Sequence, residues 1–277
     1  MKNILVGVDT SRRSRVAVEQ AVDLAGSLSA RVHLLQAIEP VGPAHSVDLG
    51  GGDDPLAIID RNAAMSADPD ATPKVPEEDD DAAAAVRLCS EANVPCTYQC
   101  PHGMATRVLR EASVAMDLLV LGRRGTTGRK AVGATASALM ANPPTPVLLC
   151  QEVTAPVERA LLAYEPSAAG GRALKLAGAL CSELNIGLDV VVAGQNRRQA
   201  GRVLEQAMAV LRAYHVEGES MQYQGRPGEA LQAVALELQS SIIVVPHNQT
   251  CSLAPHRLSS TVQAAVTFPT AMALVVP

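Results

Sequence analysis

The chain has 277 residues, of which 48% are hydrophobic and 18% charged, so it can bury large cores and is not wholly disordered. Its length favours two domains. The net charge is −5 and only 2% of the residues are aromatic, which argues against the basic and aromatic surfaces of nucleic-acid binders. The longest apolar runs, such as 117–122, have the length of a strand, whereas a membrane-spanning helix needs about 20 residues. We therefore expect neither nucleic acid nor membrane among its partners.

The first nine residues are not typical of a secretory signal. They hold one basic residue, a very short apolar run and Asp9. A signal peptide has a longer apolar core without acidic residues, so we expect a cytoplasmic protein. The six cysteines then fit reduced thiols better than a disulfide framework.

Short apolar runs alternate with helical patterns along the first half of the chain. Ser11 or Ser14 can cap the first helix. The expected strands are 4–8, 31–38, 94–99, 118–121 and 146–150, and the expected helices are 12–28, 82–93, 105–115 and 134–141. This alternation predicts a parallel sheet with helices on both faces.

One segment, 41–81, interrupts the alternation. It holds eleven acidic and two basic residues, a net charge of −9, together with several prolines and three consecutive glycines. Such a composition predicts a solvated loop without a core of its own. A regulatory segment that binds a basic partner is the alternative.

The pattern of the first half then starts again. Residues 159–167 resemble 2–11, residues 240–245 resemble 117–121, and residues 268–277 resemble 143–150. The further repeats are a helix over 172–184 and a strand over 187–193. Two copies predict two tandem open-sheet parallel α/β domains, residues 1–152 with the acidic loop and residues 157–277.

We expect these two domains to pair within the chain through their last strands. Both strands, 146–150 and 271–276, are apolar and edge-like, and an uncovered apolar edge favours pairing. The tandem arrangement supplies the partner at high effective concentration. A homodimer is a further assembly that the sequence leaves open.

A glycine-rich turn follows the fourth expected strand and leads into a helix. It contains Gly122, Gly125 and Gly133, together with basic residues at positions 123, 124, 129 and 130. Glycines let a backbone approach an anion, and N–H groups at a helix start complement its charge, so the turn can bind phosphate. The alternative is a structural loop with solvated arginines. It is not a Walker A motif, because it lacks Gly-Lys-Ser/Thr.

Here the chain resembles the universal stress protein family in its tandem form. The matching stretches are 3–11, 34–40, 117–125 and 145–149. The resemblance implies a Rossmann-like fold of the adenine-nucleotide α-hydrolase type. Members that bind ATP use Gly-x2-Gly-x9-Gly-Ser/Thr. This chain keeps three glycines, but only seven residues separate Gly125 from Gly133, and Ala134 followed by Thr135 stands where the hydroxyl residue belongs.

The resemblance also assigns residues around the adenosine. It places Asp9 beside the nucleoside, Val8 at the adenine through its backbone, and Ala37 and Leu121 around the pocket. Within the loop it implies phosphate contacts from Gly122, Arg123, Gly125, Gly133, Ala134 and Thr135. Strand ends at a topological switch point are where open α/β sheets bind ligands, which supports these positions independently. For Asp9, a helix cap is the alternative.

The second copy lacks these features. Glu165 stands where Asp9 does, and Pro246, Gln249 and Leu258 replace the three glycines. Proline removes a backbone donor, and each side chain takes space that a phosphate contact requires. We therefore expect at most one nucleotide per chain, held by the first copy.

Several functions remain open. The leading one is a stress-response regulator that binds ATP, with or without Mg²⁺, and is not an enzyme, although slow hydrolysis stays possible. The others are a protein-interaction scaffold with an unknown protein partner, and a pocket for another anionic or lipid-like ligand. Two further groupings, Cys96, Cys100 and His102, and His247, Cys251 and His256, lack the paired spacing of zinc sites. No nucleophile elbow is present, which argues against a hydrolase.

Overall fold

The protein is described by a computed structural model, which covers residues 1–9, 11–39, 81–123, 132–152, 156–194, 196–248 and 258–277. Most of the acidic segment and Gly125 therefore lie outside the described residues. The first half contains β1 (Asn3–Val8), α1 (Arg12–Leu28), β2 (Arg31–Gln36), α3 (Asp81–Glu91), β3 (Cys96–Gln99), α4 (Ala105–Ser113), β4 (Leu118–Leu121), α5 (Ala134–Ala141) and β5 (Val147–Leu149). The second half contains β6 (Arg159–Ala163), α6 (Ala168–Leu184), β7 (Gly187–Ala193), α7 (Arg197–Ala213), β8 (Ser220–Tyr223), α8 (Pro227–Glu237), β9 (Ile242–Pro246), α9 (Ser260–Thr267) and β10 (Met272–Val276).

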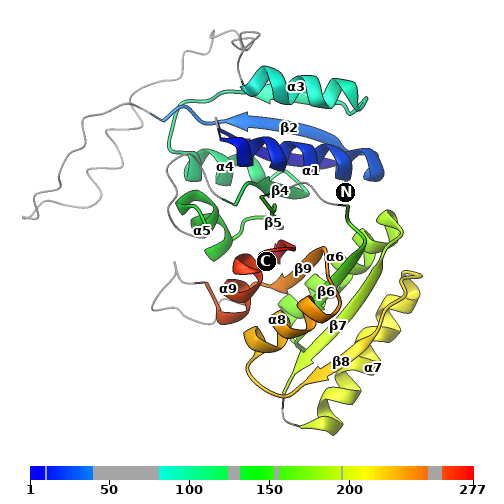
Figure 1. Cartoon of the computed structure of the whole chain (residues 1–277). Coiled ribbons are helices and arrows are strands. Elements are labelled where there is room, and N and C mark those ends of the chain that lie inside the picture. The colour runs from blue at the N-terminus through cyan, green and yellow to red at the C-terminus, as the bar shows by residue number, and fades with distance from the viewer. Residues whose placement is uncertain (10, 40–80, 124–131, 153–155, 195, 249–257) are drawn as a thin grey trace, which may run out of the picture.

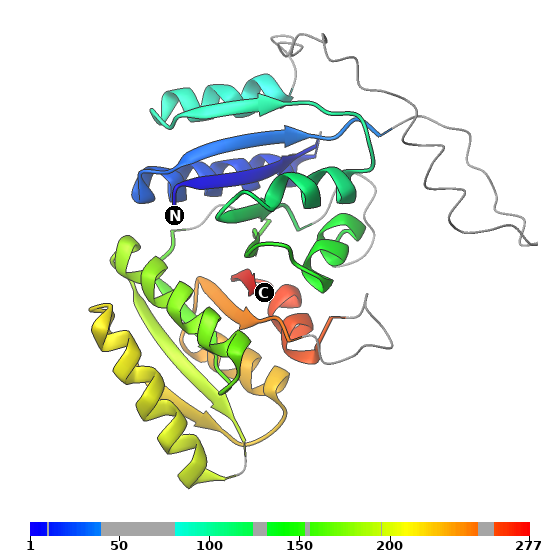
Figure 2. The ribbon, with the colours of Figure 1, turned by 180° about the vertical axis from the view of Figure 1, so that it is seen from behind.

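One continuous ten-stranded sheet runs through both halves, in the order β3-β2-β1-β4-β5-β10-β9-β6-β7-β8. The halves join where β5 and β10 pair antiparallel, with Leu149 opposite Ala273 and Val147 opposite Val275. The other neighbours pair in parallel. Figures 1 and 2 show the first half above the second, with the last strand between them. The expected pairing through the last strands is confirmed, and it merges the two predicted sheets into one.

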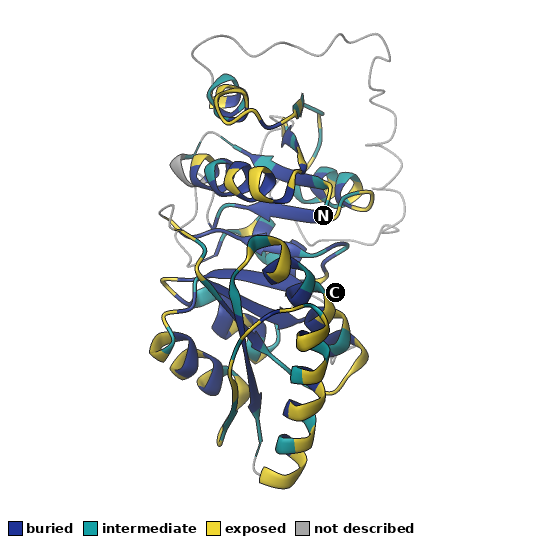
Figure 3. Cartoon of the chain, turned by 90° about the vertical axis from the view of Figure 1, so that its right-hand side faces the viewer, coloured by how far each residue is buried: buried dark blue, intermediate teal, exposed yellow. Residues whose placement is uncertain are grey.

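Helices cover both faces of the sheet, because the central strands are apolar on both sides. Along β1, Ile4, Val6 and Val8 pack on the side of α1, α3, α6 and α7, whereas Leu5 faces the opposite core, to which α4, α5, α8 and α9 contribute. Each core extends across both halves. Figure 3 shows the buried strands between helices whose outer faces are exposed. The halves therefore share their cores as well as their hydrogen bonds.

Several boundaries differ from the sequence-based prediction. Asp81 begins α3 and so belongs to a helix, although the acidic pattern placed it in the loop. Ser11, not Ser14, caps α1, and its side chain accepts the Ser14 N–H. The repeat comparison did not identify α7 or β8. The buried residues of α7, Ala200, Leu204, Ala207 and Leu211, do follow a helical period, so this helix could have been predicted; β8 is short and largely half-exposed, which gives little apolar signal.

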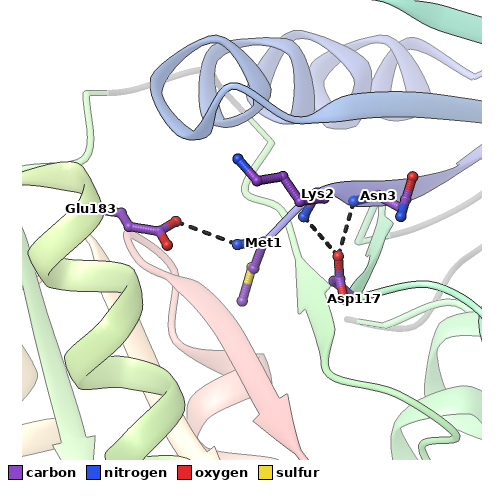
Figure 4. Close-up of polar contacts among 5 residues, drawn as sticks. All are labelled: Met1, Lys2, Asn3, Asp117 and Glu183. Carbon is purple, nitrogen blue, oxygen red and sulfur yellow. Dashed lines mark hydrogen bonds and ion pairs between the residues drawn. The ribbon is translucent and has the colours of Figure 1, made fainter.

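Polar contacts fasten the start of β1 (Figure 4). Asp117 Oδ2 accepts the N–H of Lys2 at 2.7 Å and that of Asn3 at 3.0 Å. At the corresponding place in the second half, Ser241 Oγ accepts the Glu158 N–H at 3.1 Å. The Lys2 N–H, followed by that of Asn3, holds the pKa of the Asp117 carboxyl below its ordinary value. A charge-assisted contact in one half thus has a neutral counterpart in the other.

This difference predicts a pH-dependent effect for Asp117→Asn. The ionised carboxylate contributes fully above its unfolded-state pKa of about 4, and the contribution is lost as pH falls through the lower folded-state pKa. Because Asp117 is exposed, we expect the variant to lose only about 1 kcal/mol of unfolding free energy at pH 7. Urea unfolding between pH 7 and pH 2.5 should show a flatter acid limb than wild type. Ser241→Ala, the control, should lower the free energy of unfolding without changing its dependence on pH. An equal dependence on pH for wild type and Asp117→Asn would contradict the role given to the Asp117 carboxylate.

Candidate functional site

The carboxyl ends of β1, β2 and β4 lie side by side. Val8 is opposite Gln36 in β2, and Val6 is opposite Val120 in β4. The chain leaves β1 towards β2 on one side and reaches β4 on the other, so the boundary between β1 and β4 is the topological switch point. The residues selected from the sequence are the last residues of β1 and β4 and the residues that directly follow β1, β2 and β4. Val8 and Leu121 are buried, whereas Asp9, Ala37 and Gly122 are half-buried.

Asp9 is held in a turn that starts α1. Its Oδ1 accepts the Ser11 N–H at 2.9 Å, and its own N–H donates to Ser14 Oγ at 2.9 Å. Ser11 Oγ in turn accepts the Ser14 N–H at 3.2 Å. The cap of α1 is therefore Ser11, and the Asp9 carboxylate fixes the cap in place. A carboxylate has further acceptor sites, so this contact leaves Asp9 able to accept a ligand hydroxyl.

A small cleft lies beside Asp9, on the face of the sheet covered by α1 and α3. Its lining comprises Val8, Asp9, Ser11, Ser14, Arg15, Val18, Asp81, Ala84, Ala85 and Leu88. The cavity volume is about 10 Å³, enough for about one water molecule. The cleft brings together Val8 and Asp9 but not Ala37, Leu121 or Gly122. A cavity of this size is too small to hold a nucleotide.

Gly122 and Gly133 flank the part of the glycine loop that the structure does not describe, which includes Gly125. The Gly133 N–H donates to Arg123 O at 2.9 Å, so it closes the base of the loop. We expected this N–H to be bare and available to phosphate, whereas here it is bonded within the protein; whether Gly133 contacts a ligand stays a prediction. Ala134 begins α5 and is exposed, and Thr135 follows it half-buried. The first amides of a helix have no partner within the helix, so those of Ala134 and Thr135 are the groups suited to an anion.

The Arg123 side chain does not face the position expected for phosphate. It is 6% exposed, and its Nη2 donates to Phe268 O at 2.8 Å and to Ala271 O at 3.3 Å, both in the second half. Near it, burial raises the pKa of Cys150 to about 12, and the Arg123 charge acts in the opposite direction. From the sequence we expected Arg123 to contact phosphate, with a solvated arginine as the alternative. The pairing of β5 with β10 buries this one, because it brings residues 268–271 against the start of the loop.

The corresponding edge of the second half is built differently. Ser167 caps α6, and its hydroxyl donates to Glu165 Oε1 at 3.1 Å. The Glu165 carbonyl approaches Gly170 so closely that an added Cβ would lie 2.0 Å from its oxygen. Pro246 ends β9 opposite Val276, and Leu258 is half-buried; Gln249 lies outside the described residues. The tighter turn and the missing glycines fit the expected loss of a phosphate site.

Two other features of the described residues bear on function. They contain no group of three histidine, cysteine or acidic residues placed to hold a metal ion, and Cys251 and His256 fall outside them. None of the helices in the described ranges is long and apolar enough to cross a membrane.

Known proteins resemble this chain in sequence and in fold. The model of the universal stress protein family matches residues 1–151. A universal stress protein from Archaeoglobus fulgidus DSM 4304 superposes with a TM-score of 0.72 and 16% identity, covering 99% of this chain and 97% of that one. A putative universal stress protein from Pseudomonas aeruginosa UCBPP-PA14 gives a TM-score of 0.58 and 14% identity, with 100% and 93% covered. These structures share the fold, and no curated protein matches the sequence. Because the family model covers more than half of its length, the chain belongs to the universal stress protein family.

Proposed function

We propose that the first half binds an adenine nucleotide, ATP in particular, and that the protein acts as a cytoplasmic stress-response regulator. The observation that carries this proposal is the meeting of Asp9 and Gly122 at the switch point of the sheet. Beside them, Val8 and Leu121 end β1 and β4 as buried residues on opposite faces of the sheet, and half-buried Ala37 follows β2. Family membership supports the same position, because the ATP-binding pattern that the sequence resembles falls on these residues.

The phosphates would lie at the start of α5. The amides of Ala134 and Thr135 point along the helix axis there, and the positive end of the helix dipole favours an anion. The Thr135 hydroxyl is the donor that replaces the missing hydroxyl at Ala134. Any Mg²⁺ would arrive with the triphosphate and be held largely by phosphate oxygens and water.

A regulatory role suits this site better than fast catalysis. Among the described residues at the start of α5, neither Gly133, Ala134 nor Thr135 can serve as a general base. Positioning alone does not make a fast ATPase, because the attacking water also has to be oriented and activated. Occupancy would therefore act by changing how the chain associates with a protein partner.

A specific observation favours a second function, a scaffold that binds proteins without a nucleotide. The Gly133 N–H and the Arg123 guanidinium, two groups expected to contact phosphate, both bond within the protein. If the remaining groups are too few to bind phosphate, the strand ends would serve only as a surface for a protein partner.

The substitution Ala134→Ser separates these functions. It restores a hydroxyl beside the phosphate position, and one charge-assisted hydrogen bond of about 1.5–3 kcal/mol should tighten ATP binding about ten- to a hundredfold. Calorimetric titration measures this. Ala105→Ser is the matched control, because Ala105 begins α4 as Ala134 begins α5. Equal ATP affinities for wild type and Ala134→Ser would contradict a phosphate position at the start of α5. Failure of the wild-type protein to bind millimolar ATP would favour the scaffold function.

A further inference from the structure

We propose that Arg123 is a positioning residue through which the second half of the chain holds the ligand loop of the first half. The proposal rests on the proposed nucleotide site, since it concerns the same loop. It assigns a role to the second half beyond structural pairing: the second half keeps the base of the loop in place.

Arg123 joins three parts of the molecule. It directly follows Gly122, and its carbonyl accepts the Gly133 N–H, so its backbone links the two ends of the glycine loop. Its guanidinium reaches the carbonyls of Phe268 and Ala271 in the second half. Phe268 is the C-cap residue that follows α9 and Ala271 precedes β10, and both are buried. The side chain thus fixes the loop base to a rigid part of the other half.

The second half makes the reciprocal contact. His247 follows β9 as Arg123 follows β4, and its Nε2 donates to Ala141 O at 2.8 Å. Ala141 is the last residue of α5, so each half sends a donor to the end of the other half's last helix. The carbonyls at a helix end carry partial negative charge, which favours such donors. Both contacts fasten the halves, but only Arg123 also closes the base of the glycine loop.

This difference supplies a matched control. Arg123→Met removes the hydrogen bonds to Phe268 O and Ala271 O, and His247→Leu removes the one to Ala141 O, so both variants weaken the junction between the halves. If Arg123 only fastens the halves, the two variants should affect the loop base alike. If it positions the loop, only Arg123→Met should loosen it.

Hydrogen exchange of the Gly133 amide, followed by NMR without ligand, measures how often the hydrogen bond from this amide to Arg123 O opens at the base of the loop. We expect exchange at least about tenfold faster in Arg123→Met, within about twofold of wild type in His247→Leu, and intermediate in Arg123→Lys, which keeps a donor. Unchanged exchange in Arg123→Met overturns the proposal, as does equal acceleration in both variants. Should Arg123→Met not fold, Arg123→Lys against His247→Leu gives the same comparison.

ATP affinity provides the functional readout. Calorimetry should show about tenfold weaker binding in Arg123→Met and unchanged binding in His247→Leu. Accelerated Gly133 exchange with unchanged ATP affinity would overturn the link between the loop base and the ligand. Wild-type protein that binds no ATP would refute the proposed function, while the exchange comparison would still decide whether the second half holds the loop.

Discussion

Replacing Gly218 with alanine is expected to lower the free energy of unfolding by about 4 kcal/mol, in the exceptional range for one substitution. A Cβ at this position would lie 1.8 Å from the Leu188 oxygen and 2.5 Å from its carbonyl carbon. Both neighbours of Gly218 hold this edge of the sheet: Glu217 O accepts the Leu188 N–H at 2.9 Å, and the Glu219 N–H reaches Asp189 Oδ1 at 2.8 Å. The backbone therefore has to separate from β7 to make room.

Gly201→Ala is the control in the same half. Apart from the adjacent backbone of α7 itself, no atom lies within 4 Å of the Cβ that it would add, and alanine favours a helix by up to about 1 kcal/mol over glycine. Urea unfolding followed by circular dichroism should show a large loss for Gly218→Ala and a small gain for Gly201→Ala. A loss below about 1 kcal/mol for Gly218→Ala would show that β7 and β8 can separate at little cost.

Asp189→Ala should destabilise the second half by about 3 kcal/mol, because it removes a buried carboxylate that accepts three hydrogen bonds. Asp189 is 0% exposed; it accepts from Arg159 Nη2 at 2.8 Å, from Arg159 Nε and from the Glu219 N–H at 2.8 Å. The hydrogen bonds to Asp189 raise the pKa of Arg159 above its ordinary value. Because the Arg159 side chain is 38% exposed, water satisfies part of what it loses, which keeps the expected cost at the lower end for a buried pair.

Glu111→Ala is the matched control for an exposed ion pair. Arg107 and Glu111 lie 2.8 Å apart on α4 with side chains 67% and 64% exposed, so solvent screens the pair and its removal should change stability far less than Asp189→Ala. The double variant Arg159→Met with Asp189→Leu should recover most of the stability, since it removes the charge together with its partner. Equal losses for Asp189→Ala and Glu111→Ala would contradict the assigned role of the buried carboxylate.

The same strand positions carry a neutral trio in the first half. His33 stands where Asp189 does, with Nδ1 2.9 Å from Thr97 Oγ1 and Nε2 3.3 Å from Asn3 Oδ1. Each half therefore fills this site with a polar set spanning its first three strands in space. The two copies keep the geometry while exchanging charged residues for neutral ones.

The sequence predicts those parts of the fold that depend on local pattern. The run Leu118–Leu121 predicts β4 because all its residues are apolar, and the structure buries all four of them. The pairing of β5 with β10 could be predicted because the last strand of each copy is apolar and edge-like. Arg123 and Asp189 are different. Their roles depend on partners distant in the chain, Phe268 for Arg123 and Arg159 for Asp189, which no local pattern reveals.

In the candidate site, too, some features have a local sequence signal and others do not. Asp9 and Gly122 could be located because strand ends follow from the alternation of strands and helices. The hydrogen bond from the Gly133 N–H to Arg123 O could not be predicted, because it depends on how the two ends of the loop come together. The contacts of the selected residues with a nucleotide stay predictions.

Calorimetric titration of the wild-type protein with ATP tests the central claim most directly. We expect saturable binding with one nucleotide per chain, because the second half has Pro246 and Leu258 where the first half has glycines. Two nucleotides per chain would contradict the asymmetry between the halves, and no binding at millimolar ATP would contradict the nucleotide site itself.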